Sequence, residues 1–175
     1  DGSVLATAGY DSEVKLWQMA TGRELRTLKG HNGAVFDLTF RPGGKVIASA
    51  SADRTVKLWS VESGQRLDTF SQPLKDQNTA AFSPDGRRLA AGGADNRIRV
   101  WQISEGCAEG SNPILHSRFA HEGSILKVVY SPDGRLLASS AEDHTVKIWD
   151  AGALTERFLL ERQSDWPVAL AFSAD

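Results

Sequence analysis

The sequence predicts an all-β protein built from four similar units, and three observations lead to this fold class. A run of small and apolar residues, a turn with an acidic residue, a β-branched run and a closing tryptophan recur four times in the 175 residues. The closing residues Trp17, Trp59, Trp101 and Trp149 are 42, 42 and 48 residues apart. Short apolar runs fill the sequence, and no 3.6-residue periodicity lasts long enough for an ordinary helix. A period of this length indicates an array of repeated supersecondary units.

The second unit illustrates the expected order of strands. Strands are predicted at residues 34–40, 45–51, 55–60 and 65–70, with turn residues such as Gly, Pro, Asp and Ser between them. Four short antiparallel strands joined by hairpins therefore make up one unit. The third and fourth units repeat this order, and their Ser-Pro-Asp-Gly sequences suit type I turns.

The repeat also indicates where the chain is cut. The units are 1–42, 43–84, 85–132 and 133–175, with each boundary in the turn between a first and a second strand. The chain begins with Asp1 rather than Met and has no signal peptide, so we expect a partial, excised or processed chain. Residues 167–173 are predicted to form a last innermost strand, which needs a partner strand from the same chain or from a second copy.

Two patterns indicate how the units pack. The second strand of each unit carries small residues, such as Ala48 and Ala50, which allow neighbouring sheets to approach closely near the axis of a radial array. The first strand places apolar residues at Val35, Leu38 and Phe40, with spacings of three and then two. This break in strict alternation predicts a β-bulge between the first two positions.

Composition excludes several classes of partner. The net charge of −2 gives no support for binding to nucleic acid or to an anionic membrane surface. No apolar run approaches the roughly 18 residues of a membrane-spanning helix. We therefore expect a soluble protein with no nucleic-acid or membrane partner, and an intracellular setting is favoured.

The sequence contains no recognisable metal, cofactor or catalytic site. Its four histidines are scattered, and Cys107 is the sole cysteine, so no internal disulfide can form. Cys107 lies in the one non-repetitive segment, Ser104–Pro113, which we expect to be an exposed loop with an accessible thiol. No glycine-rich phosphate loop follows a strand and opens a helix.

With these features in place, the sequence resembles the WD-repeat β-propeller family along essentially its whole length. The family has Gly-His before the first strand, an Asp in the turn after the second strand, and Trp-Asp at the end of the third. Gly30-His31 matches the first motif, and Ala120-His121 matches it with Ala for Gly. Trp149-Asp150 is a full Trp-Asp, whereas the other units keep only the tryptophan.

The resemblance implies one structural hydrogen-bond network per unit, linking a His, a Ser or Thr, the turn Asp and the Trp. The expected sets are His31, Ser49, Asp53 and Trp59; His121, Ser139, Asp143 and Trp149; Thr7, Asp11 and Trp17 without a histidine; and Asp95 with Trp101. In the third unit Pro73 and Ala91 replace the His and the hydroxyl, so Asp95 and Trp101 must be satisfied differently. The His-Ser-Asp sets resemble a hydrolase triad, but a hydroxyl buried beside a Trp without an oxyanion hole favours the structural interpretation.

The resemblance further implies a non-enzymatic protein-interaction scaffold that binds a protein or peptide on one face of the propeller. The positions expected on this face precede each turn Asp or lie on the innermost strands. They are Tyr10, Ala52, Ala94 and Glu142, then Ala34, Phe36, Asp76, Asn78, Ser124, Leu126, Trp166 and Val168. Tyr10, Phe36, Leu126 and Trp166 are the expected anchors, because aromatic residues dominate binding hot spots.

Several alternatives remain open at the level of sequence. Propellers typically have four to eight blades, so four units are part of a larger ring, half of an eight-bladed ring closed by a homodimer, a four-bladed monomer, or an assembly with another copy number. A purely architectural role in ring assembly is the main alternative function. A small-ligand or catalytic site in the central channel requires charged residues converging on the axis, and the small residues there argue against it.

Overall fold

The computed structural model describes residues 2–174, which form strands and loops and no helix, and so no helix able to cross a membrane. The strands are β1 (Val4–Ala8), β2 (Val14–Gln18), β3 (Arg23–Leu28), β4 (Val35–Phe40), β5 (Val46–Ser51), β6 (Val56–Ser60), β7 (Arg66–Phe70), β8 (Gln77–Phe82), β9 (Arg88–Gly93), β10 (Arg97–Gln102), β11 (Ile114–Phe119), β12 (Ile125–Tyr130), β13 (Leu136–Ala141), β14 (Val146–Asp150) and β15 (Glu156–Leu159). The all-β prediction is confirmed.

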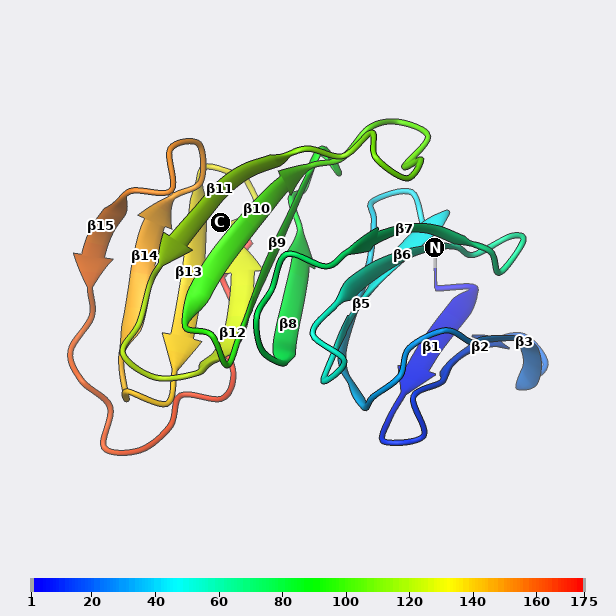
Figure 1. Cartoon of the computed structure of the whole chain (residues 1–175), viewed down its shortest axis with the longest axis horizontal. Coiled ribbons are helices and arrows are strands. Elements are labelled where there is room, and N and C mark those ends of the chain that lie inside the picture. The colour runs from blue at the N-terminus through cyan, green and yellow to red at the C-terminus, as the bar shows by residue number, and fades with distance from the viewer. Residues whose placement is uncertain (1, 175) are drawn as a thin grey trace.

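The strands form four antiparallel sheets, which are offset from the sequence units because β4, β8 and β12 each lie at the end of one unit and begin the sheet of the next. Sheet 1 contains β1–β3, sheet 2 contains β4–β7, sheet 3 contains β8–β11 and sheet 4 contains β12–β15, each in sequence order. Figure 1 shows the sheets side by side, from sheet 1 at one end to sheet 4 at the other. Strand β8 contacts both β4 and β12, and β4 contacts β1, so the first strands of sheets 2, 3 and 4 face the inside of an open arc.

The predicted bulge is present in all three complete sheets. The ladder between first and second strands shifts register between Val35 and Asp37, between Gln77 and Thr79, and between Ile125 and Lys127. The residues that follow the shifts are bonded across sheets. The Asp37 Oδ2 atom accepts from the Thr79 hydroxyl at 2.9 Å and from the Lys127 ammonium at 2.9 Å. The bulge therefore turns polar side chains toward the neighbouring sheets and ties sheets 2, 3 and 4 together.

The small residues of the second strands lie at the contacts between sheets. Ala48, Ala50, Ala90 and Ala91 are fully buried, and large apolar residues of adjoining sheets pack on them. Gly92 shows how tight this packing is, because a methyl group at its Cα would lie 2.7 Å from the Ile125 Cγ2 atom of sheet 4. Close approach of the sheets therefore explains the small residues.

We expect Gly92→Ala to lower the free energy of unfolding by about 1–2 kcal/mol, because overpacking against Ile125 outweighs the entropic benefit of alanine in a strand. Urea unfolding measures the effect. Gly106→Ala is the matched control, since no atom lies within 4 Å of its added methyl group. Equal unfolding midpoints for the two variants would contradict close packing at Gly92.

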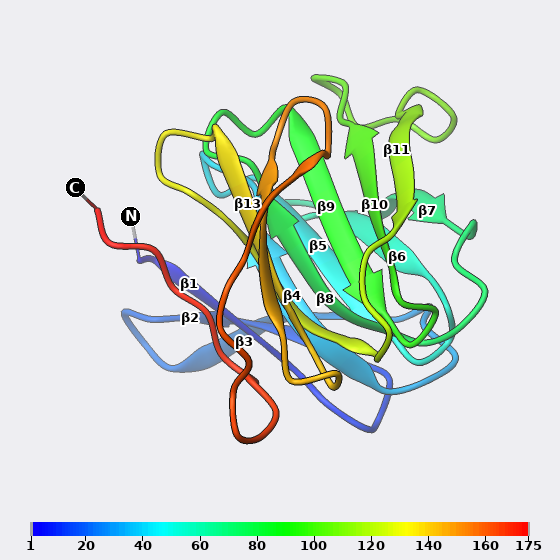
Figure 2. The same ribbon diagram turned by 90° about the vertical axis from the view of Figure 1, so that its left-hand side faces the viewer.

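Two expectations are wrong. Residues 167–173 form no strand, and Figure 2 shows the segment after β15 as coil. An innermost strand is held by the second strand of its own sheet, and residues 2–174 contain no such strand after it. Cys107 is fully buried rather than accessible, because its loop folds back and packs the side chain against the core between sheets 2 and 3.

Candidate interaction surfaces and their supporting networks

Sheet 2 joins four side chains in a continuous hydrogen-bonded chain. His31 precedes β4, Ser49 lies on β5, Asp53 in the following turn and Trp59 on β6. The His31 Nδ1 atom is 2.7 Å from Asp53 Oδ2, and the His31 Nε2 atom is 2.6 Å from Ser49 Oγ. The Trp59 indole N–H donates to the same serine oxygen at 2.8 Å. The network fixes the turn after β5 to the segment before β4 and to the core.

Sheet 4 repeats this arrangement. The His121 Nδ1 atom is 3.2 Å from Asp143 Oδ2, and Nε2 is 2.7 Å from Ser139 Oγ. The Trp149 indole N–H donates to Ser139 Oγ at 2.8 Å. Sequence reasoning missed a fifth member, Thr145, whose hydroxyl donates to Asp143 Oδ1 at 2.6 Å. Thr55 does the same for Asp53 in sheet 2, so the shared Asp-x-Thr spacing was the available signal.

Sheet 3 holds its aspartate with an arginine instead of a histidine. The Arg99 Nη2 atom is 2.7 Å from Asp95 Oδ2, and both side chains are buried. The backbone N–H groups of Leu74 and Arg97 also donate to this carboxylate. The Trp101 indole N–H has no hydrogen-bond partner among the described residues, and the ring stacks on Phe70 with centroids 4.6 Å apart. The arginine was visible in the sequence where the other units have lysine.

Sheet 1 carries an incomplete network. The Trp17 indole N–H donates to the Thr7 hydroxyl at 2.8 Å. Asp11 is exposed and accepts from the Glu13 backbone N–H at 3.2 Å. No histidine bridges Thr7 and Asp11, and a cavity of about 350 Å³ lies beside them.

Hydrogen bonds control the ionisation of the turn aspartates. Burial alone raises the pKa of Asp53, but donation from His31, Thr55 and the Asn32 backbone outweighs it and holds the pKa well below its usual range. For Asp143, burial is likewise outweighed by donation from Thr145 and the Glu122 backbone, and the pKa is lowered. Desolvation lowers the pKa of His121 despite the neighbouring carboxylate. In sheet 4 these shifts favour an anionic Asp143 beside a neutral His121 imidazole.

The lowered pKa values predict a specific pH dependence. An Asp with a depressed folded pKa adds stability above its unfolded pKa of about 3.9, and this stability is lost as pH falls through the folded pKa. We expect the free energy of unfolding to decrease as the pH drops below about 4. In Asp143→Asn this decrease is expected to be smaller. Urea unfolding between pH 6 and 2 measures the slope. A parallel NMR titration in which the Asp143 carboxyl titrated above its usual range would contradict the assignment.

The expected partner face is only partly assembled. Tyr10 is 88% exposed and Phe36 is 44% exposed, and their rings meet edge to face with centroids 6.2 Å apart. Trp166 is 53% exposed on the segment after β15, with exposed Val168 beyond it. The remaining positions are mostly half-buried, namely Ala34, Ala52, Ala94, Ser124, Leu126 and Glu142, with Asp76 exposed.

Asn78 and Ser124, two positions of the expected face, are bonded to one another. The Asn78 Nδ2 atom donates to Ser124 Oγ and to the Ile125 carbonyl, each at 2.9 Å. This pair joins sheets 3 and 4 and uses the Asn78 Nδ2 group for that contact. Tyr10 and Phe36 are the two expected anchors that the fold brings together.

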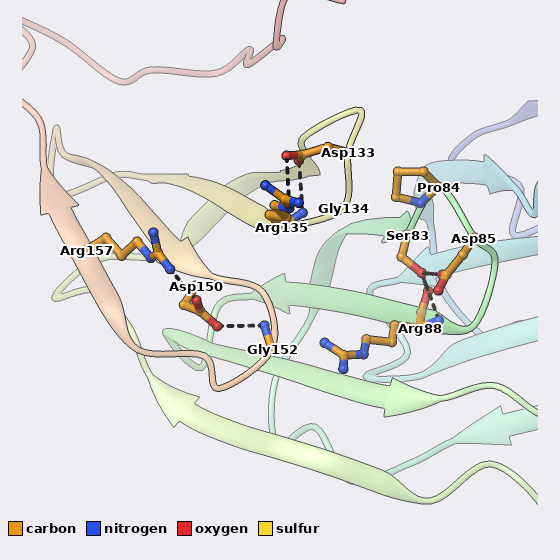
Figure 3. A pocket seen from close by; sticks show the side chains of 10 residues that line it. All are labelled: Ser83, Pro84, Asp85, Arg88, Asp133, Gly134, Arg135, Asp150, Gly152 and Arg157. Carbon is orange, nitrogen blue, oxygen red and sulfur yellow. Dashed lines mark hydrogen bonds and ion pairs between the residues drawn. The ribbon is translucent and has the colours of Figure 1, made fainter.

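A larger concavity lies at the other end of the strands and was missed by sequence reasoning. It has a volume of about 770 Å³ and lies between sheets 3 and 4. Figure 3 shows its lining, which comes from the first-to-second-strand turns of both sheets and the turn between β14 and β15. Its residues include the guanidinium groups of Arg88, Arg135 and Arg157. Among residues 2–174 no group of His, Cys, Asp and Glu side chains could hold a metal ion.

Comparison with known proteins agrees with this architecture. The sequence pattern of the WD40 family, described as WD domain, G-beta repeat, matches residues 22–60, 64–102 and 113–150. These segments cover more than half of the chain and include the third unit, although its His and hydroxyl are absent. Each match begins in or just before an outer strand and ends with the third strand of the following sheet.

Individual relatives match over single repeats. The nuclear distribution protein PAC1-2 of Postia placenta is 46% identical over 44 residues, which is 25% of this chain and 10% of that protein. Coronin-7 of Mus musculus is 43% identical over 42 residues, covering 24% and 5% of the two chains. The human dynein assembly factor with WD repeat domains 1 is 46% identical over 39 residues, covering 22% and 9%.

The matched regions span a tenth or less of these relatives, so the comparison concerns the repeat and not a whole protein. The repeat period, the four antiparallel sheets, the His-Ser-Asp-Trp networks and the matched sequence pattern all point to one family. This chain belongs to the WD40 family of β-propeller repeat proteins.

Proposed function

We propose that this chain is a non-enzymatic scaffold that binds a protein or peptide on the face formed by the turns after the second strands. WD40 repeats and the WD-repeat relatives support a protein-interaction role in general. The observation that carries the proposal is the exposed aromatic pair of Tyr10 and Phe36, which come from sheets 1 and 2. Rigid exposed aromatics are typical binding hot spots.

Burial of the serines supports a role without catalysis. Ser49 and Ser139 have no exposed surface, and each hydroxyl accepts from a tryptophan N–H. A substrate cannot reach either oxygen without opening the core, so the networks hold turns in place. Two relatives are named for nuclear distribution and dynein assembly, which supports an intracellular setting for the proposed scaffold.

A peptide-display selection on the immobilised chain tests the proposal. Peptides that bind are measured against Tyr10→Ser and Phe36→Ser, and we expect affinity losses of about 30-fold, as for hot-spot residues. Leu25→Ser is the matched control, since Leu25 on β3 is 45% exposed and lies away from this face. Selected peptides that bind all variants equally would contradict the proposed face.

Ring assembly by a second copy is the other candidate function, and the incomplete network of sheet 1 favours it. Thr7 and Asp11 lie beside a cavity on β1 where sheets 2 and 4 have a histidine that precedes their first strand. A first strand supplied by a second copy would cover β1. Sedimentation tests this, with a mass of twice 19.0 kDa expected for a closed homodimer. A monomer at micromolar concentration would contradict it.

A further inference from the structure

The concavity between sheets 3 and 4 has a counterpart between sheets 2 and 3. The proline of each of these first-to-second-strand turns packs close to the glycine of the corresponding turn in the next sheet. A methyl group added at Gly86 would lie 3.4 Å from Pro42, and one added at Gly134 would lie 3.4 Å from Pro84. The two junctions are therefore repeats of one geometry, and the contents of one can be compared with the contents of the other.

The first junction holds a peptide segment through an arginine. The Arg41 Nε atom of sheet 2 donates to the Gly86 carbonyl at 2.8 Å. Its Nη1 atom donates to the carbonyls of Ser104 and Glu105 at 3.1 and 3.2 Å. These carbonyls belong to the inserted loop between β10 and β11, whose Cys107 is fully buried. The Arg41 guanidinium of sheet 2 therefore holds backbone segments of sheet 3 in place.

The second junction also has an arginine, Arg88, but no inserted loop for it to hold. Ser83 occupies the position of Arg41, and its hydroxyl donates to Asp85 within its own turn. The connection between β14 and β15 is short and carries no inserted loop. Arg88 takes over the role of Arg41, with Nη1 donating to the Ala151 carbonyl at 2.6 Å. The space of about 770 Å³ lies where the second junction has no inserted loop.

The three carboxylates around this space already accept hydrogen bonds from groups of their own sheet. Asp85 and Asp133 each accept from a serine hydroxyl and a backbone N–H of their own turn. Asp150 accepts from the Gly152 and Ala153 N–H groups and from Arg157 Nη2 at 2.6 Å. Each carboxylate therefore has partners within its own sheet, and Figure 3 marks several of these bonds with dashed lines.

The guanidinium groups, in contrast, have donors to spare. An arginine has five N–H donors. The Arg88 guanidinium donates one hydrogen bond and has no carboxylate partner among the described residues. The Arg157 guanidinium also donates one hydrogen bond, to Asp150. Arg135 is mostly exposed, and its Nε atom is 3.8 Å from Asp133 Oδ2, which is too long for a hydrogen bond. A ligand that completes this site must bring acceptor oxygens, and carboxylates suit guanidinium forks best.

We infer that the groove between sheets 3 and 4 binds an acidic peptide segment of a partner protein, laid across the junction as the inserted loop is laid across its neighbour. A glutamate or aspartate of this segment accepts from Arg88 and Arg157, and peptide carbonyls take the remaining donors. The site lies at the opposite end of the strands from Tyr10 and Phe36, so it extends the proposed function with a second, independent surface.

Fluorescence anisotropy with labelled ten-residue peptides of Gly and Ser tests the inference. One peptide carries three glutamates, a second carries three glutamines, and a third carries three phosphoserines. We expect the glutamate peptide to bind the whole chain and to lose at least about tenfold in affinity with Arg88→Gln or Arg157→Gln, the usual size of a charge-assisted hydrogen bond. Circular dichroism verifies that each variant is folded.

Arg118→Gln is the matched control, because Arg118 is exposed on β11 outside the groove. Its affinity for the glutamate peptide is expected to stay within about twofold of the unchanged chain. Equal binding of the glutamate and glutamine peptides, or equal losses for Arg88→Gln and Arg118→Gln, overturns the inference. Binding of the phosphoserine peptide alone also overturns it, in favour of a phosphate site. Tyr10→Ser leaves this binding unchanged, which separates the result from the test of the other face.

Discussion

Arg99→Met is expected to lower the free energy of unfolding by about 3–5 kcal/mol, the usual consequence of removing one partner of a buried ion pair. The side chains of Arg99 and Asp95 are only 4% and 6% exposed, and their nearest atoms are 2.7 Å apart. Methionine fills the space of the arginine stem but leaves the Asp95 carboxylate with backbone donors alone. Urea unfolding at pH 7 measures the loss.

Lys57→Met is the matched control for Arg99→Met, because Lys57 occupies the same position on β6 of sheet 2. Asp53 is held there by His31 and Thr55 and does not depend on the lysine. Desolvation lowers the pKa of Lys57, so removal of its charge relieves a burial penalty. We expect a change within about 1 kcal/mol for this variant.

A double variant, Asp95→Asn with Arg99→Met, separates the loss of the arginine from the burial of an unpaired charge. Removing both charges is expected to recover most of the stability, since a buried pair adds little over neutral residues of similar volume. Equal losses for Arg99→Met and Lys57→Met would show that the ion pair does not hold sheet 3.

The repeat made most of the fold predictable. The period of the tryptophans predicted four units, the apolar positions within Val35–Phe40 predicted the strand, and the break in their alternation predicted its bulge. These features depend on local pattern, which a single sequence displays. Pro73 stands where the second unit has His31, which indicated that Asp95 needs another partner. The sequence did not identify that partner.

The failures concern contacts between segments that are distant in the sequence. Cys107 looked exposed because its loop is rich in Gly, Ser and Asn, but Arg41 draws this loop onto the junction between sheets 2 and 3. Residues 167–173 have the pattern of an inner strand but no strand to pair with among residues 2–174. The groove lined by Arg88 brings together turns of two different sheets, and the pattern within a single unit does not show how such turns meet.

Ser139→Ala is expected to lower the free energy of unfolding by about 2–4 kcal/mol, because it leaves two buried groups without a partner at about 1–3 kcal/mol each before relaxation. The Ser139 hydroxyl bonds both His121 Nε2 at 2.7 Å and the Trp149 indole N–H at 2.8 Å. Its neighbour Ser140 provides a control of the same chemistry and burial. Neither serine has exposed surface, but the Ser140 hydroxyl has no hydrogen-bond partner within residues 2–174.

Ser140→Ala is therefore expected to be neutral or stabilising, since it removes an unsatisfied hydroxyl and restores the alanine that sheet 2 has at Ala50. Urea unfolding of the two variants side by side gives the comparison, with indole N–H hydrogen exchange of Trp149 as a local measure. Faster exchange in Ser139→Ala alone is the expected result. Equal losses at the two positions would mean that burial of a serine, and not its place in the network, determines its effect on stability.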